Sequence, residues 1–315
     1  MFRNIFTSWI AGTAMMFFAA CTPMESTPSA DGSVTLYAVT TGADSTFAAE
    51  PLMEPIVVLN AGQFEKPIPN LPENSTTEAF DQALNKAMSR FFPGNGKFSL
   101  YIGGVLSGKV QITSNSEGEG NNPAGLVNPV KIMTNALNAE RFAIAANSEQ
   151  FNAPGRKTRK LTPQEEQAIL PLAKSAFGGN RVNPALLDSI QTQAIRVYDL
   201  NGKGAETVIG DFVIEHRSSS AEGEAAISRE LLFVIAEKVQ GNFVMRVSAF
   251  GSSGEFATED SQMIDLIDVL DVDGDGVFEV VVRRNMAESY DFAIYKKQGN
   301  DWQVAYQGGG GGVAN

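Results

Sequence analysis

The segment that decides the fold reads Met263-Ile264-Asp265-Leu266-Ile267-Asp268-Val269-Leu270-Asp271-Val272-Asp273-Gly274-Asp275-Gly276-Val277-Phe278-Glu279-Val280-Val281-Val282-Arg283. Two runs rich in Val and Ile flank a short loop of alternating aspartates and glycines. Runs of this length and composition, bounded by Asp and Gly, are typical of strands joined by a tight turn. The segment therefore predicts two neighbouring strands with an acidic loop between them.

The same order of elements occurs earlier in the chain. Ile195 to Tyr198 leads into the loop Asp199-Leu200-Asn201-Gly202-Lys203-Gly204, and a long apolar strand from Thr207 to Glu215 follows it. Each loop is then followed by two more strand-like runs, at residues 231–239 and 243–250 in the first unit and at 290–297 and 302–306 in the second. A four-stranded antiparallel meander is the blade unit of a propeller. We therefore expect two such blade-like meanders over residues 194–308.

The acidic loop is a candidate metal site. Asp271, Asp273 and Asp275 alternate along the chain, Gly276 lets the backbone curl back, and Glu279 follows. Ca²⁺ needs several oxygen ligands at short range, and a loop that presents every second side chain inward can supply them. The loop begins like an EF-hand, but Val282 stands at its twelfth position, where a bidentate carboxylate is needed. The alternative interpretation is a solvated Asp-Gly turn that holds no metal.

This loop, with strands on both sides, resembles the calcium loops of FG-GAP and VCBS-type repeats, which occur in integrin-like propellers and in many exported bacterial proteins. The resemblance covers Ala194 to about Gly308. It implies one Ca²⁺ that fixes the loop rather than taking part in catalysis. The ligands that it implies are the side chains of Asp271, Asp273, Asp275 and Glu279, with the main-chain carbonyl of Val277 in addition.

The first unit departs from this pattern. Asn201 replaces the second aspartate, Lys203 stands at the third position, and Glu206 falls one residue early. A shift of one residue along a strand moves a side chain to the other face of the sheet. We therefore expect the Lys203 ammonium to neutralise this loop and no metal to bind there.

The only cysteine, Cys21, follows a short apolar stretch from Ile5 to Ala20. This stretch is short for a membrane span but suits the hydrophobic core of an export signal. The run Phe18-Ala19-Ala20-Cys21 resembles the lipobox of bacterial lipoproteins, whose cysteine is lipidated and becomes the new N-terminus. The resemblance implies an outer-membrane lipoprotein, periplasmic or surface-exposed, that is anchored to the membrane through acyl chains on Cys21. The alternative is a buried apolar helix with an incidental cysteine.

The remaining segments complete an α+β chain that is mainly β, with a central helical section. We expect a signal peptide at 1–20, a flexible tether at 21–50, and an N-terminal β-rich domain with one helix at 51–150. Residues 151–193 are expected to form a helical connector, in which Thr162 and Glu165 make a capping box. Residues 309–315 are expected to be a glycine-rich tail. The alternative for these glycines is a strand whose missing side chains allow close backbone contact.

Composition narrows the function. A net charge of −12 argues against nucleic acid as a partner. With His216 as the only histidine and Cys21 committed to lipid, Cys-His catalysis and a multi-histidine zinc site are excluded. We expect a non-enzymatic binding protein with a protein or polysaccharide partner. The alternatives are a cell-envelope hydrolase that uses Asp265 or Asp268 in acid–base chemistry, and a structural subunit of an outer-membrane assembly.

Two blades cannot close a propeller, which typically has at least about four. Each blade is a sheet with apolar faces that must be covered by something else. We therefore expect the two units to pack on each other, on the region 51–150, or across an oligomer.

Overall fold

A computed structural model describes residues 26–27, 29, 32–41, 51–68, 76–113, 126–134, 142–153, 157–219, 225–254 and 261–312. The fold is mainly β, as predicted, with three antiparallel sheets and a central helical section. Cys21 and the predicted signal peptide lie outside the described residues. No helix in the described part of the chain is long and apolar enough to cross a membrane.

The first sheet contains seven strands in the order β1-β7-β4-β5-β6-β2-β3, and β1 also pairs with β2. This extra pairing closes six of the strands into what we call the N-terminal barrel. Its elements are β1 (Val34–Thr40), β2 (Leu52–Asn60), β3 (Gln63–Glu65), α1 (Thr77–Phe91), β4 (Lys97–Ile102), β5 (Val105–Ile112), β6 (Asn128–Ile132) and β7 (Phe142–Ala146). Small barrels are filled by side chains. Here Tyr37, Val39, Phe98 and Leu100 fill the interior together with Phe91 of α1.

The prediction of a flexible tether over residues 21–50 is wrong for β1. Residues 35–39 are all buried, and β1 pairs with β2 on one side and with β7 on the other. Buried on both faces, the strand lacks the polar alternation of a half-exposed strand. Because the neighbouring residues are rich in Ser and Thr, the sequence pattern favoured the interpretation as a loop.

The second sheet has the order β12-β11-β10-β9-β8 and is called here the five-stranded sheet. Its elements are β8 (Thr158–Arg159), α2 (Pro163–Gly179), the 3₁₀ helix η2 (Pro184–Ser189), β9 (Gln191–Asp199), β10 (Glu206–Ser219), β11 (Ala225–Val239) and β12 (Asn242–Ser253). The predicted four-stranded meander is present as β9 to β12, and β8 adds a fifth strand.

The helical section at 151–193 is a cover for this sheet rather than a connector. The predicted capping box is confirmed, because Thr162 and Glu165 bond each other's backbone N–H groups at the start of α2. Ile169 and Phe177 of α2 pack against Phe212 and Leu232 in one apolar cluster. The apolar face of the five-stranded sheet therefore needs this helix for its burial.

The third sheet, called here the C-terminal sheet, is the predicted four-stranded meander. Its strands are β13 (Met263–Leu270), β14 (Glu279–Asn285), β15 (Ser289–Gln298) and β16 (Asp301–Gly312). The expected glycine-rich tail is wrong up to Gly312, because β16 continues through these glycines. A Cβ on Gly309 would lie 2.8 Å from the carbonyl oxygen of Ile56 in β2. The absent side chains thus allow β16 to approach the barrel, as the alternative interpretation required.

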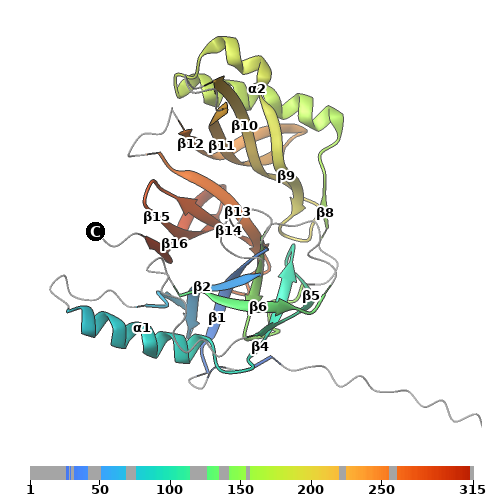
Figure 1. Ribbon diagram of the computed structural model, residues 1–315. Coiled ribbons are helices and arrows are strands. Elements are labelled where there is room, and N and C mark those ends of the chain that lie inside the picture. Colours follow the sequence, from blue (N-terminus) through green and yellow to red (C-terminus); the bar gives the residue numbers. More distant parts are fainter. Residues whose placement is uncertain are drawn as a thin grey trace, which may run out of the picture.

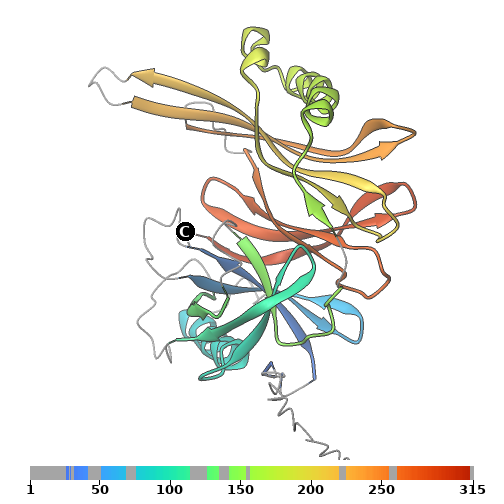
Figure 2. The ribbon, with the colours of Figure 1, turned by 90° about the vertical axis from the view of Figure 1, so that its right-hand side faces the viewer.

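The three sheets are stacked, with the C-terminal sheet in the middle (Figures 1 and 2). One of its faces, including Val281 and Ile294, packs on Leu36 and Ile56 of the barrel. Its other face, including Val280 and Ala293, packs on the five-stranded sheet. The five-stranded sheet and the C-terminal sheet therefore pack on each other, and the C-terminal sheet also packs on the N-terminal barrel, which are two of the three expected solutions.

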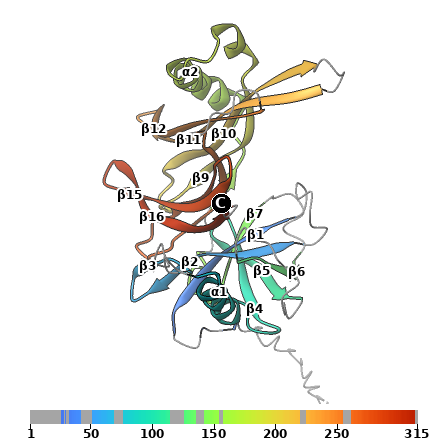
Figure 3. The same cartoon turned by 60° about the vertical axis from the view of Figure 1, so that its left-hand side comes forward.

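The β10–β11 hairpin projects from this stack as a long arm (Figure 3). Near its end His216 Nε2 lies 3.4 Å from Glu230 Oε2. No other histidine exists in the chain. His216 thus lies on β10, whereas the acidic loop lies between β13 and β14.

Candidate metal centre

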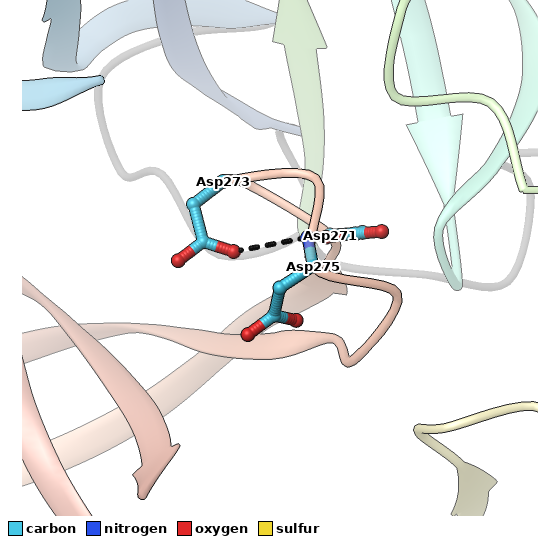
Figure 4. Close-up of side chains that lie close together, drawn as sticks. All are labelled: Asp271, Asp273 and Asp275. Atoms are coloured by element: carbon cyan, nitrogen blue, oxygen red, sulfur yellow. Dashed lines mark hydrogen bonds between the residues drawn. The ribbon is translucent and has the colours of Figure 1, made fainter.

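The acidic loop lies between β13 and β14, and it brings three of the predicted ligands together. One carboxylate oxygen from each of Asp271, Asp273 and Asp275 lies within 4.8 Å of the others. The side chains of Asp273 and Asp275 leave the loop on the same side (Figure 4). This group can hold a metal ion.

Hydrogen bonds inside the loop explain why the sequence folds this way. Gly276 N–H donates to Asp271 Oδ2 at 3.0 Å, and Val277 N–H donates to Asp275 Oδ1 at 2.8 Å. Asp275 N–H donates to Asp273 Oδ1 at 3.3 Å. Such bonds from backbone N–H groups to an aspartate two or more residues earlier are typical of tight turns. Each aspartate therefore uses one oxygen to wind the loop and keeps its second oxygen for another partner.

Glu279, the fourth predicted side-chain ligand, is the first residue of β14 and is only 1 % exposed. Its Oε2 accepts the N–H of Val272 at 2.7 Å. Burial raises the pKa of this carboxyl to about 8. Val277 N–H donates to Asp275 Oδ1, and the role of the Val277 carbonyl as a ligand stays a prediction.

The donor set fits a hard cation. Burial raises the pKa of Asp271, and the charges of Asp275 and Asp273 act in the same direction. Asp271 Oδ1 is buried and accepts no hydrogen bond from the described residues. An unsatisfied buried carboxylate oxygen costs free energy, and a cation beside it would remove that cost.

Sequence reasoning missed one residue of this site, Lys296 of β15. Its Nζ contacts the Asp273 carboxylate and lies 2.9 Å from Asp275 Oδ2 and 3.8 Å from Glu279 Oε1. Burial lowers the pKa of Lys296, but its hydrogen bonds to Asp273 and Asp275 outweigh this effect and raise it. Because Val280 pairs with Tyr295, the next residue of β15, Lys296, lies beside the acidic loop. This register was the only available signal, and a single sequence does not give it.

The loop of the first unit is wound by the same pattern of hydrogen bonds as the acidic loop, with Asn201 and Lys203 in the places of Asp273 and Asp275. Gly204 N–H donates to Asp199 Oδ2 at 3.1 Å, and Lys203 N–H donates to Asn201 Oδ1 at 2.9 Å. The absence of a metal here stays a prediction. The two loops are nevertheless joined, because Phe278 N–H, directly after the acidic loop, donates to the carbonyl of Leu200 at 2.8 Å.

The acidic loop therefore lies where all three sheets meet. The Phe278 side chain is 2 % exposed, and its ring faces Gly104 in the β4–β5 turn of the barrel. Asp268 of β13 binds the same turn, since its carboxylate accepts Gly103 N–H at 3.0 and 2.9 Å. Asp268 also accepts the N–H of Val269 at 2.8 Å. This aspartate thus joins the C-terminal sheet to the N-terminal barrel through hydrogen bonds.

A groove of about 890 Å³ runs along the same junction and is lined by residues of all three sheets. Asp265 and Asp268, the two carboxylates considered for hydrolysis, both lie on it. Asp265 accepts the side-chain amide of Asn285 at 2.8 Å. Backbone N–H groups of Gly103 and Val269 engage Asp268.

Comparisons of the chain with protein-family models, with curated proteins and with solved structures found no match. The resemblance to FG-GAP and VCBS-type repeats therefore stays a prediction, which depends on the loop residues and their flanking strands. The same holds for the lipobox at Cys21.

Proposed function

We propose that this chain is an exported, lipid-anchored binding protein without enzymatic activity, whose two C-terminal units are FG-GAP/VCBS-like repeats. Calcium on the acidic loop stabilises the repeats. The observation that carries the proposal is the group of three carboxylate oxygens within 4.8 Å beside the buried Glu279. The leader that ends at Cys21 supports an outer-membrane location, either periplasmic or surface-exposed.

Asp271, Asp273, Asp275 and Glu279 would hold the ion, and the charge of the ion would offset the repulsion among these carboxylates. Asp271 and Glu279 also bond the backbone of the loop, through Gly276 and Val272. Phe278 then connects the loop to the five-stranded sheet and to the barrel. A fixed loop would thus hold three layers in place rather than perform chemistry.

The groove at this junction is the proposed partner site. Its lining includes Arg196, Arg229, Asp265 and Asn285, so it is polar and carries both signs of charge. Such a lining suits a polar partner, either a protein segment or a polysaccharide, rather than an apolar ligand. The net charge of −12 disfavours nucleic acid.

Calcium is expected to stabilise the full chain, purified in detergent, against thermal unfolding. A ligand that binds only the folded state at ten times its Kd contributes about 1.4 kcal/mol. For a chain of this size, that corresponds to a rise in Tm of roughly 2–3 °C. Isothermal calorimetry measures the Kd for calcium, and thermal scans with calcium or with chelator measure the shift in Tm.

Asp271→Asn should abolish this response. The asparagine keeps an oxygen for Gly276 N–H but loses the charge that the ion needs. Asp188→Asn is the matched control, because the Asp188 side chain is 91 % exposed and pairs with Lys174 away from the loop. Wild-type protein that gives neither heat nor a Tm shift at millimolar calcium would remove the metal from the proposal.

The anchor is tested separately at Cys21. Cells supplied with labelled palmitate should incorporate it into the wild-type chain and not into Cys21→Ser, because the thiol is the predicted acylation site. Fluorography of the immunoprecipitated protein reads this out. Equal labelling of both proteins, or none in the wild type, contradicts the lipoprotein assignment.

A further inference from the structure

A positive charge already lies against the acidic loop, namely the ammonium of Lys296 from the neighbouring strand β15. It contacts Asp273 and Asp275, which lie on the same side of the loop, and it is 3.8 Å from Glu279. An ammonium among carboxylates satisfies the same electrostatic need as a metal ion. The two cations would therefore compete for the same oxygens.

A second observation points to a cation with more ligands than an ammonium can engage. The Glu279 side chain is 1 % exposed, and among the residues that the structure describes only its Oε2 accepts a hydrogen bond, from Val272 N–H. Its Oε1 is directed at Lys296 but lies beyond hydrogen-bond distance. An ammonium has three donors, whereas Ca²⁺ takes six to eight oxygens. The ammonium thus leaves oxygens unused that a divalent ion would engage.

The neighbouring lysine shows that this placement is specific to position 296. Successive side chains of a strand point to opposite faces. Lys297 accordingly points away from the loop and pairs with Glu237 of the five-stranded sheet at 2.5 Å. Lys297 is therefore a matched control on the same strand.

We propose that Lys296 is an internal cation that neutralises the acidic loop in the metal-free protein, and that a divalent ion binds by displacing its ammonium. This inference rests on the proposed calcium site and adds a regulation to it. The Lys296 side chain is 21 % exposed, and its stem is flexible, so the ammonium can move into solvent without a change in the backbone. The loop then remains folded at low calcium, and the competition sets a threshold for binding.

Removing the ammonium should tighten calcium binding. Calorimetric titration of the full chain in detergent is expected to give a Kd for Lys296→Met that is at least about tenfold lower than that of the wild type. That factor corresponds to about 1.4 kcal/mol. Lys297→Met should bind calcium like the wild type. Lys296→Gln, which also lacks the charge, replaces Lys296→Met if the latter does not fold.

A measurement on the wild-type protein needs no variant. Acetic anhydride labels exposed amines, and mass spectrometry of the digested protein gives the rate at each lysine. Calcium should raise the labelling rate of Lys296 several-fold and leave that of Lys297 unchanged.

The outcomes separate the two proposals. Calcium binding with equal affinity for wild type and Lys296→Met, or with unchanged labelling of Lys296, overturns the displacement and leaves the calcium site in place. Absence of binding in the wild type and in both Lys296 variants overturns the site and the displacement together.

Discussion

Gly104→Ala is expected to lower the free energy of unfolding by about 3 kcal/mol, because two separate costs add at this position. Gly104 has φ +73°, where a residue with a Cβ is strained by about 1 kcal/mol. A Cβ there would also overlap the ring of the buried Phe278. Overpacking of this kind typically costs about 1–3 kcal/mol. Urea denaturation of the full chain measures the sum.

Gly62 provides a control that isolates the backbone cost. It has φ +78° in the β2–β3 turn, and a Cβ on it would meet nothing within 4 Å. Gly62→Ala should therefore cost only about 1 kcal/mol. If both alanine variants lose the same stability, the barrel turn does not press on Phe278 and the contact is wrong.

Removing the ring should also rescue the substitution. Phe278→Ala alone is expected to cost about 3–5 kcal/mol, because it leaves a cavity at the junction of the three sheets. In that background, however, Gly104→Ala should add only the backbone cost of about 1 kcal/mol. Residues in contact couple in such a cycle, and distant ones do not. A coupling near zero would contradict the stacking of the acidic loop against the barrel.

The sequence predicted the strands and the helix at this junction but not the tertiary contacts between them. Alternating and continuous apolar runs identified β9 to β16, and the Thr162–Glu165 capping box identified the start of α2, because these signals lie within a few residues of each other. The contact of Phe278 with Gly104 joins two turns that are far apart in the chain. Nothing in the residues near either turn encodes which turn it will meet.

The residues of the candidate metal site also fall into a group that could be predicted from the sequence and one that could not. The spacing of Asp271, Asp273 and Asp275 is local, and the structure brings these residues together as expected. Lys296 enters through the register of β14 with β15. A shift of one residue in that register would have directed Lys297 to the loop instead. The acidic loop could thus be predicted, whereas its neutralising cation could not.

Glu54→Gln is expected to stabilise the protein by up to about 3 kcal/mol at pH 8 and to have little effect at pH 4.5. Glu54 is a buried carboxyl of β2 in the interface between the barrel and the C-terminal sheet. Tyr290 Oη donates to its Oε1 at 2.8 Å. Burial raises the pKa of Glu54 from 4.5 to about 7, although Tyr290 and the charge of Arg283 act in the opposite direction.

The sign follows from the state that the folded protein prefers. A carboxyl whose pKa is higher in the folded than in the unfolded state favours folding when it is protonated. Its contribution is therefore fully present below about pH 4.5 and is lost as the pH rises through about 7. Each pKa unit corresponds to about 1.4 kcal/mol, which gives the upper limit of about 3 kcal/mol. Glutamine keeps an oxygen for Tyr290 and carries no charge at any pH, so its advantage should grow across this window.

The difference between wild type and Glu54→Gln cancels the titration of the other carboxylates, which both proteins share. Urea denaturation at pH 4.5, 6 and 8 should give a difference that increases at each step. Glu65→Gln, on the exposed strand β3 of the same sheet, is the matched control and should show no such trend. A difference that stays constant with pH would mean that Glu54 is not a desolvated carboxyl. The C-terminal sheet would then not cover β2 as the stacked architecture requires.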